Sequence, residues 1–189
     1  MKLLKLLTTA VLTLSLSGCA GLFLAGAATT ATIVTDTRST SEMWKDNNIE
    51  FEIASITNKT PYIENVRISG SSYQGVVVLM GQANDKALLS QLVDDVEQID
   101  GVTEVYDQVR QREPLTVSGI SRDSWLTTKV KSALLTEKDL NGIKVKVITE
   151  DEEVFLLGYV THHHADIATE VARNISGVKR VIKAFQYGD

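Results

Sequence analysis

The chain has 189 residues, a formal net charge of −5 and a single cysteine. This length allows one or two small domains, and 43% hydrophobic with 23% charged residues are globular proportions rather than those of a disordered chain. One cysteine excludes an intramolecular disulfide and a zinc site built from cysteines. The acidic balance argues against nucleic-acid binding, because neutralising phosphates requires clustered lysine and arginine.

The first residues have the features of a secretory signal. Lys2 and Lys5 give a short positive start, and residues 6–16 form an apolar run too short to span a bilayer. The run ends in Leu16-Ser17-Gly18-Cys19, which resembles the lipobox of bacterial lipoproteins. The resemblance implies cleavage before Cys19 and acylation of its thiol, and two or more acyl chains make a stable anchor. The alternative is an ordinary signal peptide followed by an incidental buried cysteine.

The residues after Cys19 indicate where the anchor would lie. Ala20 stands where retention in the inner membrane would favour aspartate, so the resemblance implies the outer membrane. Removal of residues 1–18 would leave 17 basic and 24 acidic residues, a net charge of −7. Residues 20–35 are rich in Ala, Gly and Thr, which is typical of a tether. We therefore expect a lipid-anchored protein on the periplasmic side of the outer membrane of a Gram-negative bacterium.

The rest of the chain contains an internal repeat. Residues 78–81 (VLMG) align with residues 155–158 (FLLG) at an offset of 77, and the same offset pairs Asp46 with Asp123. Further along, Gly101-Val102-Thr103-Glu104-Val105 aligns with Gly177-Val178-Lys179-Arg180-Val181 at an offset of 76. Two copies of one unit predict two domains of the same fold.

The periodicity of apolar residues changes in the same order in both copies: helix, strand, strand, helix, strand. In copy one the pattern predicts a helix around 49–56, strands at 65–69 and 76–81, a helix at 88–99 and a strand around 105–109. In copy two it predicts a helix around 126–134, strands at 144–148 and 153–159, a helix at 167–175 and a strand at 181–187. We expect Gly101 and Gly177 to be the C-caps of the second helices. The order predicts an α+β fold of two tandem αββαβ sandwiches.

This order, with a glycine at the end of the central strand and Gly-Val after the second helix, resembles the BON domain. Two copies behind a lipobox resemble the dual BON-domain outer-membrane lipoproteins of the DolP/YraP type, most clearly at residues 123–130 (DSWLTTKV) and 154–158 (VFLLG). Copy one departs from the pattern at Phe51 and Glu52, where basic residues are commoner. The expected organisation is a signal peptide at 1–18, a lipidated tether at 19–41, BON domain 1 at 42–112, a linker at 113–120 and BON domain 2 at 121–189.

Differences between the copies indicate function, because two copies of one fold must share their core positions. Position 125 is Trp where copy one has Asn48, and a helix would place Arg122 and Lys129 on the same face as Trp125. Residues 122–134 carry a local charge of +2, against −2 for residues 45–57. A tryptophan beside cations suits the interface of an anionic bilayer.

The resemblance implies that this helix binds an anionic phospholipid membrane. It carries over to six positions: Arg122, Ser124, Trp125, Thr128, Lys129 and Ser132. It also implies support of envelope integrity and accumulation at division sites. Two alternatives stay open: Trp125 packs against the first domain, or the surface makes the chain a periplasmic scaffold for an outer-membrane assembly protein.

Other features point away from catalysis. We expect no cofactor, metal or small-molecule substrate and no enzyme, because the sequence has no nucleophile elbow, phosphate-binding glycine loop or base–nucleophile set. Three consecutive histidines at 162–164 cannot all face one ion from a regular element, so we expect them to open the second helix of copy two. The acidic run 150–153 predicts a solvated hairpin tip rather than a calcium loop. Trp44 is expected to precede the first helix; packing on domain 1 is the favoured interpretation, and contact with the membrane near the tether is the alternative.

Overall fold

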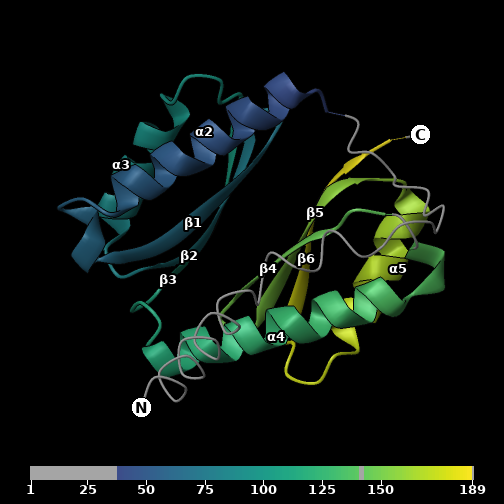
Figure 1. The fold of residues 1–189 in the computed structure, drawn as a ribbon. Helices are drawn as coiled ribbons and strands as arrows, with labels where there is room; N and C mark the ends of the chain where they lie inside the picture. The colour runs from purple at the N-terminus through teal and green to yellow at the C-terminus, as the bar shows by residue number, and fades with distance from the viewer. Residues whose placement is uncertain (1–37, 141–142, 189) are drawn as a thin grey trace, which may run out of the picture. The chain divides into compact units, whose positions relative to one another are not determined.

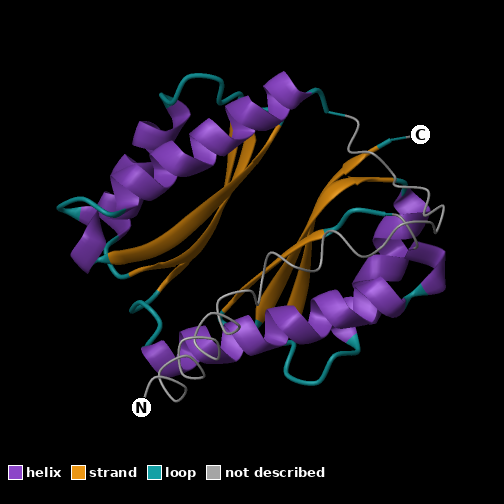
Figure 2. Cartoon of the chain, viewed as in Figure 1, coloured by secondary structure: helices purple, strands orange, loops and turns teal. Residues whose placement is uncertain are grey.

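The computed structural model of the protein describes residues 38–140 and 143–188, and within them the predicted order of elements is confirmed in both copies (Figure 1). Domain 1 contains, in chain order, α2 (Thr40–Thr57), η2 (Tyr62–Glu64), β1 (Val66–Tyr73), β2 (Val76–Ala83), α3 (Lys86–Glu97) and β3 (Glu104–Gln111). Domain 2 contains α4 (Val117–Thr136), η3 (Lys138–Leu140), β4 (Lys146–Glu150), β5 (Glu153–Val160), α5 (His162–Arg173) and β6 (Arg180–Tyr187). Each domain is therefore a helix-and-sheet sandwich of the predicted α+β class (Figure 2).

Each domain has a three-stranded sheet with the same pairing. β1 and β2 form an antiparallel hairpin, and β3 returns parallel to β2, so the order is β1-β2-β3. Domain 2 repeats this arrangement as β4-β5-β6. The two helices of a domain cover one face of its sheet, as Figure 1 shows.

The central strands β2 and β5 are buried on both faces, which explains why they read as unbroken apolar runs rather than alternating ones. On β2, Val77 and Leu79 belong to the core under the helices of domain 1. Val78 and Met80 point the other way and form a separate buried cluster with Phe155 and Leu157 of β5. The second face of each central strand is thus covered by the other copy of the repeat.

The glycine in each central strand is required by a close backbone approach. Gly81 and Gly158 have φ of +132° and +145°, where side chains are strongly disfavoured. A Cβ at Gly81 would lie 2.0 Å from the carbonyl oxygen of Arg67, and one at Gly158 would lie 2.6 Å from that of Lys144. The glycine that ends the repeated motif therefore allows the neighbouring strand to pair.

Two predicted helix starts differ from the structure because hydroxyl residues cap the helices earlier. Ser39 forms a capping box with Glu42, so α2 begins at Thr40 and already contains Trp44. Thr116 accepts a hydrogen bond from the backbone N–H of Gly119, so α4 begins at Val117, inside the segment predicted as linker. Apolar periodicity alone did not show these polar first turns.

The predicted roles of Gly101 and Gly177 as helix C-caps are wrong. α3 ends at Glu97 and α5 at Arg173, so each glycine lies four residues beyond the helix. The intervening residues form a further turn, in which Val102 N–H donates to the Ile99 carbonyl and Val178 N–H to that of Ile175. Both glycines have positive φ and turn the chain into the last strand.

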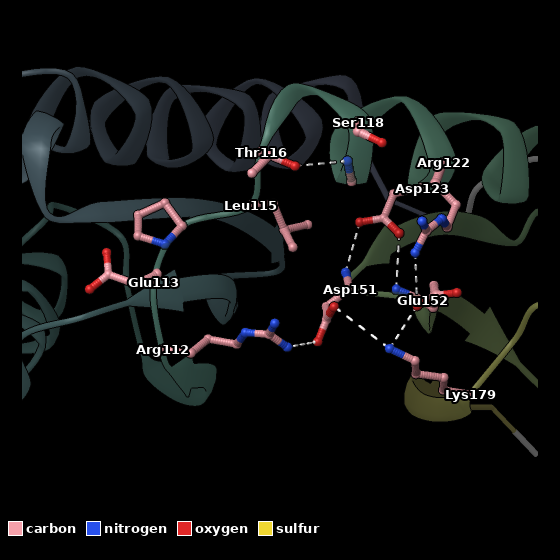
Figure 3. A pocket seen from close by; sticks show the side chains of 12 residues that line it. Arg112, Glu113, Leu115, Thr116, Ser118, Arg122, Asp123, Asp151, Glu152 and Lys179 are labelled. Atoms are coloured by element: carbon pink, nitrogen blue, oxygen red, sulfur yellow. Dashed lines mark hydrogen bonds and ion pairs between the residues drawn. The ribbon is translucent and has the colours of Figure 1, made fainter.

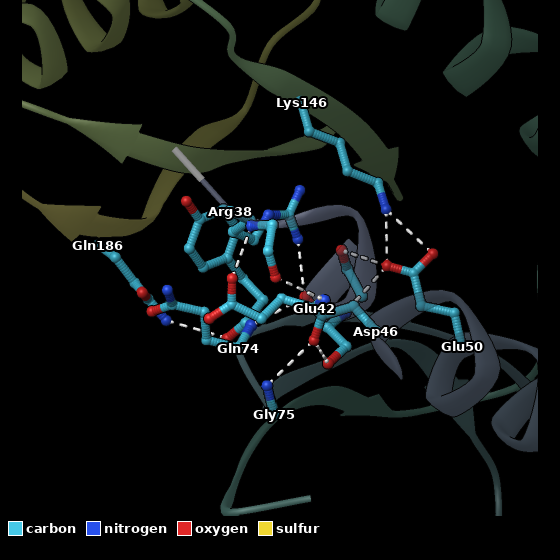
Figure 4. A network of polar contacts seen from close by, with 12 residues as sticks. Arg38, Glu42, Asp46, Glu50, Gln74, Gly75, Lys146 and Gln186 are labelled. Carbon is cyan, nitrogen blue, oxygen red and sulfur yellow. Dashed lines mark hydrogen bonds and ion pairs between the residues drawn. The ribbon is translucent and has the colours of Figure 1, made fainter. Parts of the chain in front are cut away.

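In each domain a buried aspartate of the first helix holds the turn of the hairpin. In domain 1 both carboxylate oxygens of Asp46 are used (Figure 4): Gly75 N–H donates at 3.0 Å, Gln74 N–H at 2.9 Å, the Ser72 hydroxyl at 2.7 Å and Arg38 at 2.8 Å. In domain 2 Asp123 accepts from the backbone N–H groups of Asp151 at 2.7 Å and Glu152 at 2.9 Å. The turn residues Gln74, Gly75, Asp151 and Glu152 all have positive φ. The carboxylate thus fixes both the turn and the position of the helix on the sheet.

These bonds predict how Asp46 stabilises domain 1. Burial alone would raise the pKa of Asp46, but the hydrogen bonds from Gly75, Ser72, Gln74 and Arg38 together outweigh it and lower the pKa below its ordinary value. Asp46→Asn should therefore reduce the free energy of unfolding by about 2 kcal/mol at neutral pH. Because the folded pKa is lowered, the stabilisation is present above the ordinary aspartate pKa and is lost as the pH falls through the folded value, so the two proteins converge in acid.

Urea denaturation over a series of pH values measures this difference. Asp100→Asn, at an exposed position after α3, is the control with the same change of charge. Equal losses of stability in the two variants at neutral pH would contradict the role of Asp46.

Candidate functional site

The candidate site is the outward face of α4, and its orientation follows from the residues on the opposite face. Leu126, Val130 and Leu134 are buried against the sheet, as predicted, and Asp123 is anchored on the hairpin turn. Because a helix turns by about 100° per residue, these contacts leave the face that carries Trp125 directed away from the core.

Trp125 is exposed, with 66% of its surface accessible. The alternative in which it packs as a plug against the first domain does not agree with this exposure. Thr128 and Ser132, which follow on the same face, are also exposed. The structure therefore brings Trp125, Thr128 and Ser132 together as one accessible stripe.

Two of the three small hydroxyl residues of the site, Ser124 and Thr128, donate their hydroxyl protons within the helix. The Ser124 hydroxyl donates to the Ile120 carbonyl at 3.0 Å, and the Thr128 hydroxyl donates to the Ser124 carbonyl at 3.0 Å. These side chains therefore offer small neutral surface next to Trp125 rather than free donors for a phosphate. Because these side chains are small, a flat surface can come close to the helix at this point.

The two predicted cations lie beside Trp125 and each has a partner within domain 2. Lys129 Nζ donates to the carbonyl oxygen of Ser176 at 2.6 Å, in the turn after α5. Arg122 is 61% exposed and lies 3.6 Å from a carboxylate oxygen of Glu152. The positive charge of the helix is therefore partly compensated at its N-terminal end.

Sequence reasoning missed Lys179, which extends the basic surface beyond α4. Its ammonium donates to Glu152 at 2.6 Å and its side chain is 57% exposed. Glu152 therefore lies between Lys179 and Arg122 (Figure 3). The hydrogen bond from Lys179 lowers the pKa of Glu152, and the same bond raises the pKa of Lys179. The repeat contained the signal, because Lys179 and Arg180 align with Thr103 and Glu104 of copy one.

The expectation that the acidic run 150–153 is a solvated tip is wrong. Asp151 and Glu152 do form the hairpin turn, but all four carboxylates are at least partly buried and each has a cationic partner. The partners come from both domains: Arg67 for Glu150, Arg110 and Arg180 for Glu153, Arg112 and Lys179 for Asp151, and Lys179 and Arg122 for Glu152. The charges that compensate the run lie far away in sequence, which is why local composition suggested exposure.

The expectation for Trp44 is also wrong. Trp44 lies within α2 rather than before it, and it is 66% exposed rather than packed on domain 1. The histidine run, in contrast, opens α5 as predicted: His162 is its first residue and stacks on Tyr187, with ring centroids 4.0 Å apart. Within residues 38–140 and 143–188 there is no group of three or more His, Cys, Asp or Glu side chains placed to hold a metal ion.

The predicted anchor lies outside the described residues, because Cys19 and residues 20–37 of the tether precede Arg38. The last residues of the predicted tether are described, and α2 begins within them at Thr40. In the part of the chain that is described, no helix is both long enough and apolar enough to cross a bilayer.

Comparison with known families identifies the class of protein. The model of the BON domain matches twice, at residues 45–113 and 122–189, which together cover most of the chain. The chain therefore belongs to the BON-domain family, with two copies of the domain in tandem.

Comparison with individual proteins narrows this class. The chain is 38% identical to the outer membrane lipoprotein DolP of Haemophilus influenzae over 178 residues, which cover 94% of this chain and 92% of that protein. It is 40% identical to a 21 kDa hemolysin of Actinobacillus pleuropneumoniae over 80% of this chain and 79% of that protein. It is 33% identical to the osmotically-inducible protein Y of Escherichia coli over 63% of this chain and 61% of that protein. The first similarity, over nearly the full length, shows an outer-membrane lipoprotein of the DolP type.

The pairing of the acidic run predicts the effect of removing a cation. Glu150 is 8% exposed and its nearest cation is Arg67 of β1, so Arg67→Ala leaves a buried carboxylate without its counter-ion. We expect the free energy of unfolding to fall by about 2 kcal/mol at neutral pH. Burial raises the pKa of Glu150, and Arg67 opposes this rise. Loss of Arg67 raises the pKa of the folded state further above that of the unfolded chain, so the variant should regain part of the lost stability as the pH falls into the mildly acidic range.

Urea unfolding of both proteins at neutral and mildly acidic pH checks this prediction. Arg173→Ala is the matched control, because Arg173 pairs with Glu170 while both side chains are more than half exposed; it should change stability by less than about 0.5 kcal/mol. A loss in Arg67→Ala that does not diminish in acid would contradict the role assigned to Glu150.

Proposed function

We propose that the chain binds anionic phospholipid through α4, the first helix of its second BON domain, and that this contact supports envelope integrity without catalysis. In this proposal Cys19 carries the acyl chains that hold the protein at the periplasmic face of the outer membrane, and binding through α4 favours sites rich in anionic lipid, such as division sites. The observation that carries the proposal is the 66% exposure of Trp125 on a helix whose other face is buried.

The chemistry of the face supports a bilayer as the ligand. An indole partitions into the headgroup region, where its apolar ring and polar N–H are both accommodated. Arg122 and Lys129 lie on the same side of the helix, and Lys179 adds a third cation near Arg122. Each cation held near an anionic surface contributes about 1 kcal/mol to binding. Domain 1 has Asn48 in place of Trp125 and a negative first helix, so the proposal assigns the preference for anionic lipid to domain 2.

The test uses Trp125→Asn, which introduces the residue that domain 1 carries at the equivalent position. We expect the variant to bind anionic micelles about tenfold more weakly, because it loses the buried area of the indole. Binding is measured from backbone NMR shifts of α4 in a chain that starts at residue 20, titrated with phosphatidylglycerol-containing and with phosphatidylcholine micelles.

Tyr106→Asn, an exposed aromatic residue on β3, is the matched control and should leave the α4 shifts unchanged. If the wild-type α4 resonances do not respond to anionic micelles, the lipid proposal is wrong. Retention of an envelope protein that depends on Trp125, without any lipid response, would instead support the periplasmic scaffold.

A second variant increases binding if the proposal is correct. Glu152 lies between Arg122 and Lys179 and competes with lipid phosphates for both cations. Glu152→Gln should therefore tighten binding to anionic micelles by about fivefold, as one additional near-surface charge becomes available. Glu97→Gln, at an exposed position of α3, makes the same change in net charge and should have little effect. Equal tightening by both variants would show a general charge effect rather than a site on α4.

A further inference from the structure

Domain 1 has an exposed aromatic face of its own, on α2. Trp44 is 66% exposed and Phe51 is 74% exposed, and they are seven residues apart, so they lie on one side of the helix nearly in line with its axis. The opposite side of α2 is buried through Asp46, Ile49, Ile53 and Thr57. The two largest apolar side chains on the outward side of α2 are thus not part of the core.

The repeat shows that this is the same helix face that Trp125 occupies in domain 2. At the offset of 77, Trp44 corresponds to Ser121, Phe51 to Thr128 and Asn48 to Trp125. Ser121 and Thr128 are exposed in domain 2, so none of these positions is needed for packing in either copy. Each domain therefore presents aromatic residues on its first helix at positions where the other copy has small polar ones.

The aromatic face of α2 differs from that of α4 in charge. Within about 60° of Trp44 around the helix there is no charged residue. The positions in this sector are Thr40, Ser41, Trp44, Asn47, Asn48, Phe51 and Ser55. Lys45 and Glu52 lie at the edge of the sector and have opposite signs. Inserting this face into the headgroup region would therefore bury aromatic surface without removing a charge from water, and it would gain nothing from anionic lipid.

The place of α2 in the chain argues for a bilayer rather than a protein as the partner. α2 is the first described helix after Cys19, and only residues 20–39 separate the two. Twenty residues reach at most about 70 Å, so the anchor keeps α2 within that distance of the membrane. A tethered surface meets its ligand at a high effective concentration, so even a weak aromatic contact is populated.

We propose that the face of α2 formed by Trp44 and Phe51 is a second membrane-contacting surface, which inserts into the bilayer interface regardless of headgroup charge. The proposal rests on anchoring through Cys19 and not on lipid binding by α4. In the anchored protein, α2 would hold domain 1 at the bilayer, while α4 would respond to the anionic lipid content.

The experiment uses the two tryptophans of the chain as separate reporters. Trp125→Phe leaves Trp44 as the only tryptophan, and Trp44→Phe leaves Trp125. Each lipidated full-length protein is reconstituted into vesicles that contain brominated phosphatidylcholine, with or without phosphatidylglycerol. We expect Trp44 emission to shift to shorter wavelength and to be quenched equally in both vesicles, whereas Trp125 is quenched only with phosphatidylglycerol.

Phe51→Ser in the Trp44 reporter should lower the inserted fraction about fivefold, because Phe51 shares the contact. Tyr106→Ser in the same reporter is the matched control and should leave the quenching of Trp44 unchanged. If Trp44 is unquenched in both vesicles, the proposal is overturned, whatever Trp125 shows. If only Trp125 is unquenched, the result contradicts lipid binding by α4 and leaves the proposal for α2 standing. A discrete protein adduct from a photo-crosslinker at position 51 in intact envelopes, together with unquenched Trp44, would assign the face to a protein partner.

Discussion

The feature on which the rest of each domain depends is the hydrogen bonding between an aspartate of the first helix and the turn of the adjacent hairpin. Asp46 and Asp123 occupy the same position of the repeat, and each accepts two backbone N–H groups from a turn whose residues have positive φ. A buried carboxylate is costly unless such donors satisfy it. The arrangement therefore ties the rotation of the helix to the hairpin and decides which residues face outward.

This constraint explains how two copies with one fold can present different outward surfaces. The buried positions of the first helices are mostly apolar in both domains, while the outward positions are free to vary because packing does not depend on them. Domain 2 carries Trp125 beside cations, and domain 1 carries Trp44 and Phe51 on an uncharged face. The same scaffold thus presents two aromatic surfaces that differ in their electrostatics.

The acidic run 150–153 shows that the charges of residues adjacent in sequence do not by themselves give the electrostatic potential around the site. Four consecutive carboxylates would repel one another in isolation, but in the folded chain arginines of domain 1 and cations of domain 2 surround them. This pairing also affects the candidate site, because Glu152 forms an ion pair with Arg122, a residue expected to contact lipid. The basic character of the α4 surface therefore depends on Lys179 as well as on the helix itself, a contribution visible only after folding.

The repeat, the order of the elements and the buried positions of both first helices could be predicted from the sequence, because periodicity and internal alignment are local signals. Comparison with Asn48 also indicated that Trp125 is not part of the core of its own domain, but it left open whether Trp125 packs against the first domain. The helix starts were missed, since capping by Ser39 and Thr116 depends on single polar residues outside the apolar pattern. The exposure of Trp44 was missed, although the small polar residue at the equivalent position, Ser121, is the same kind of signal as Asn48.

The sequence by itself thus determined what kind of fold the chain adopts and which helix to examine, since 3.6-residue and two-residue periods and a 77-residue repeat are written in the order of residues. Only the tertiary structure decided which charges are compensated and which aromatic side chains remain accessible. Arg67 and Glu150, or Glu152 and Lys179, are far apart in the chain and meet only in the folded protein. Burial and ion pairing depend on contacts between residues that are far apart in the chain, so no local sequence pattern contains them.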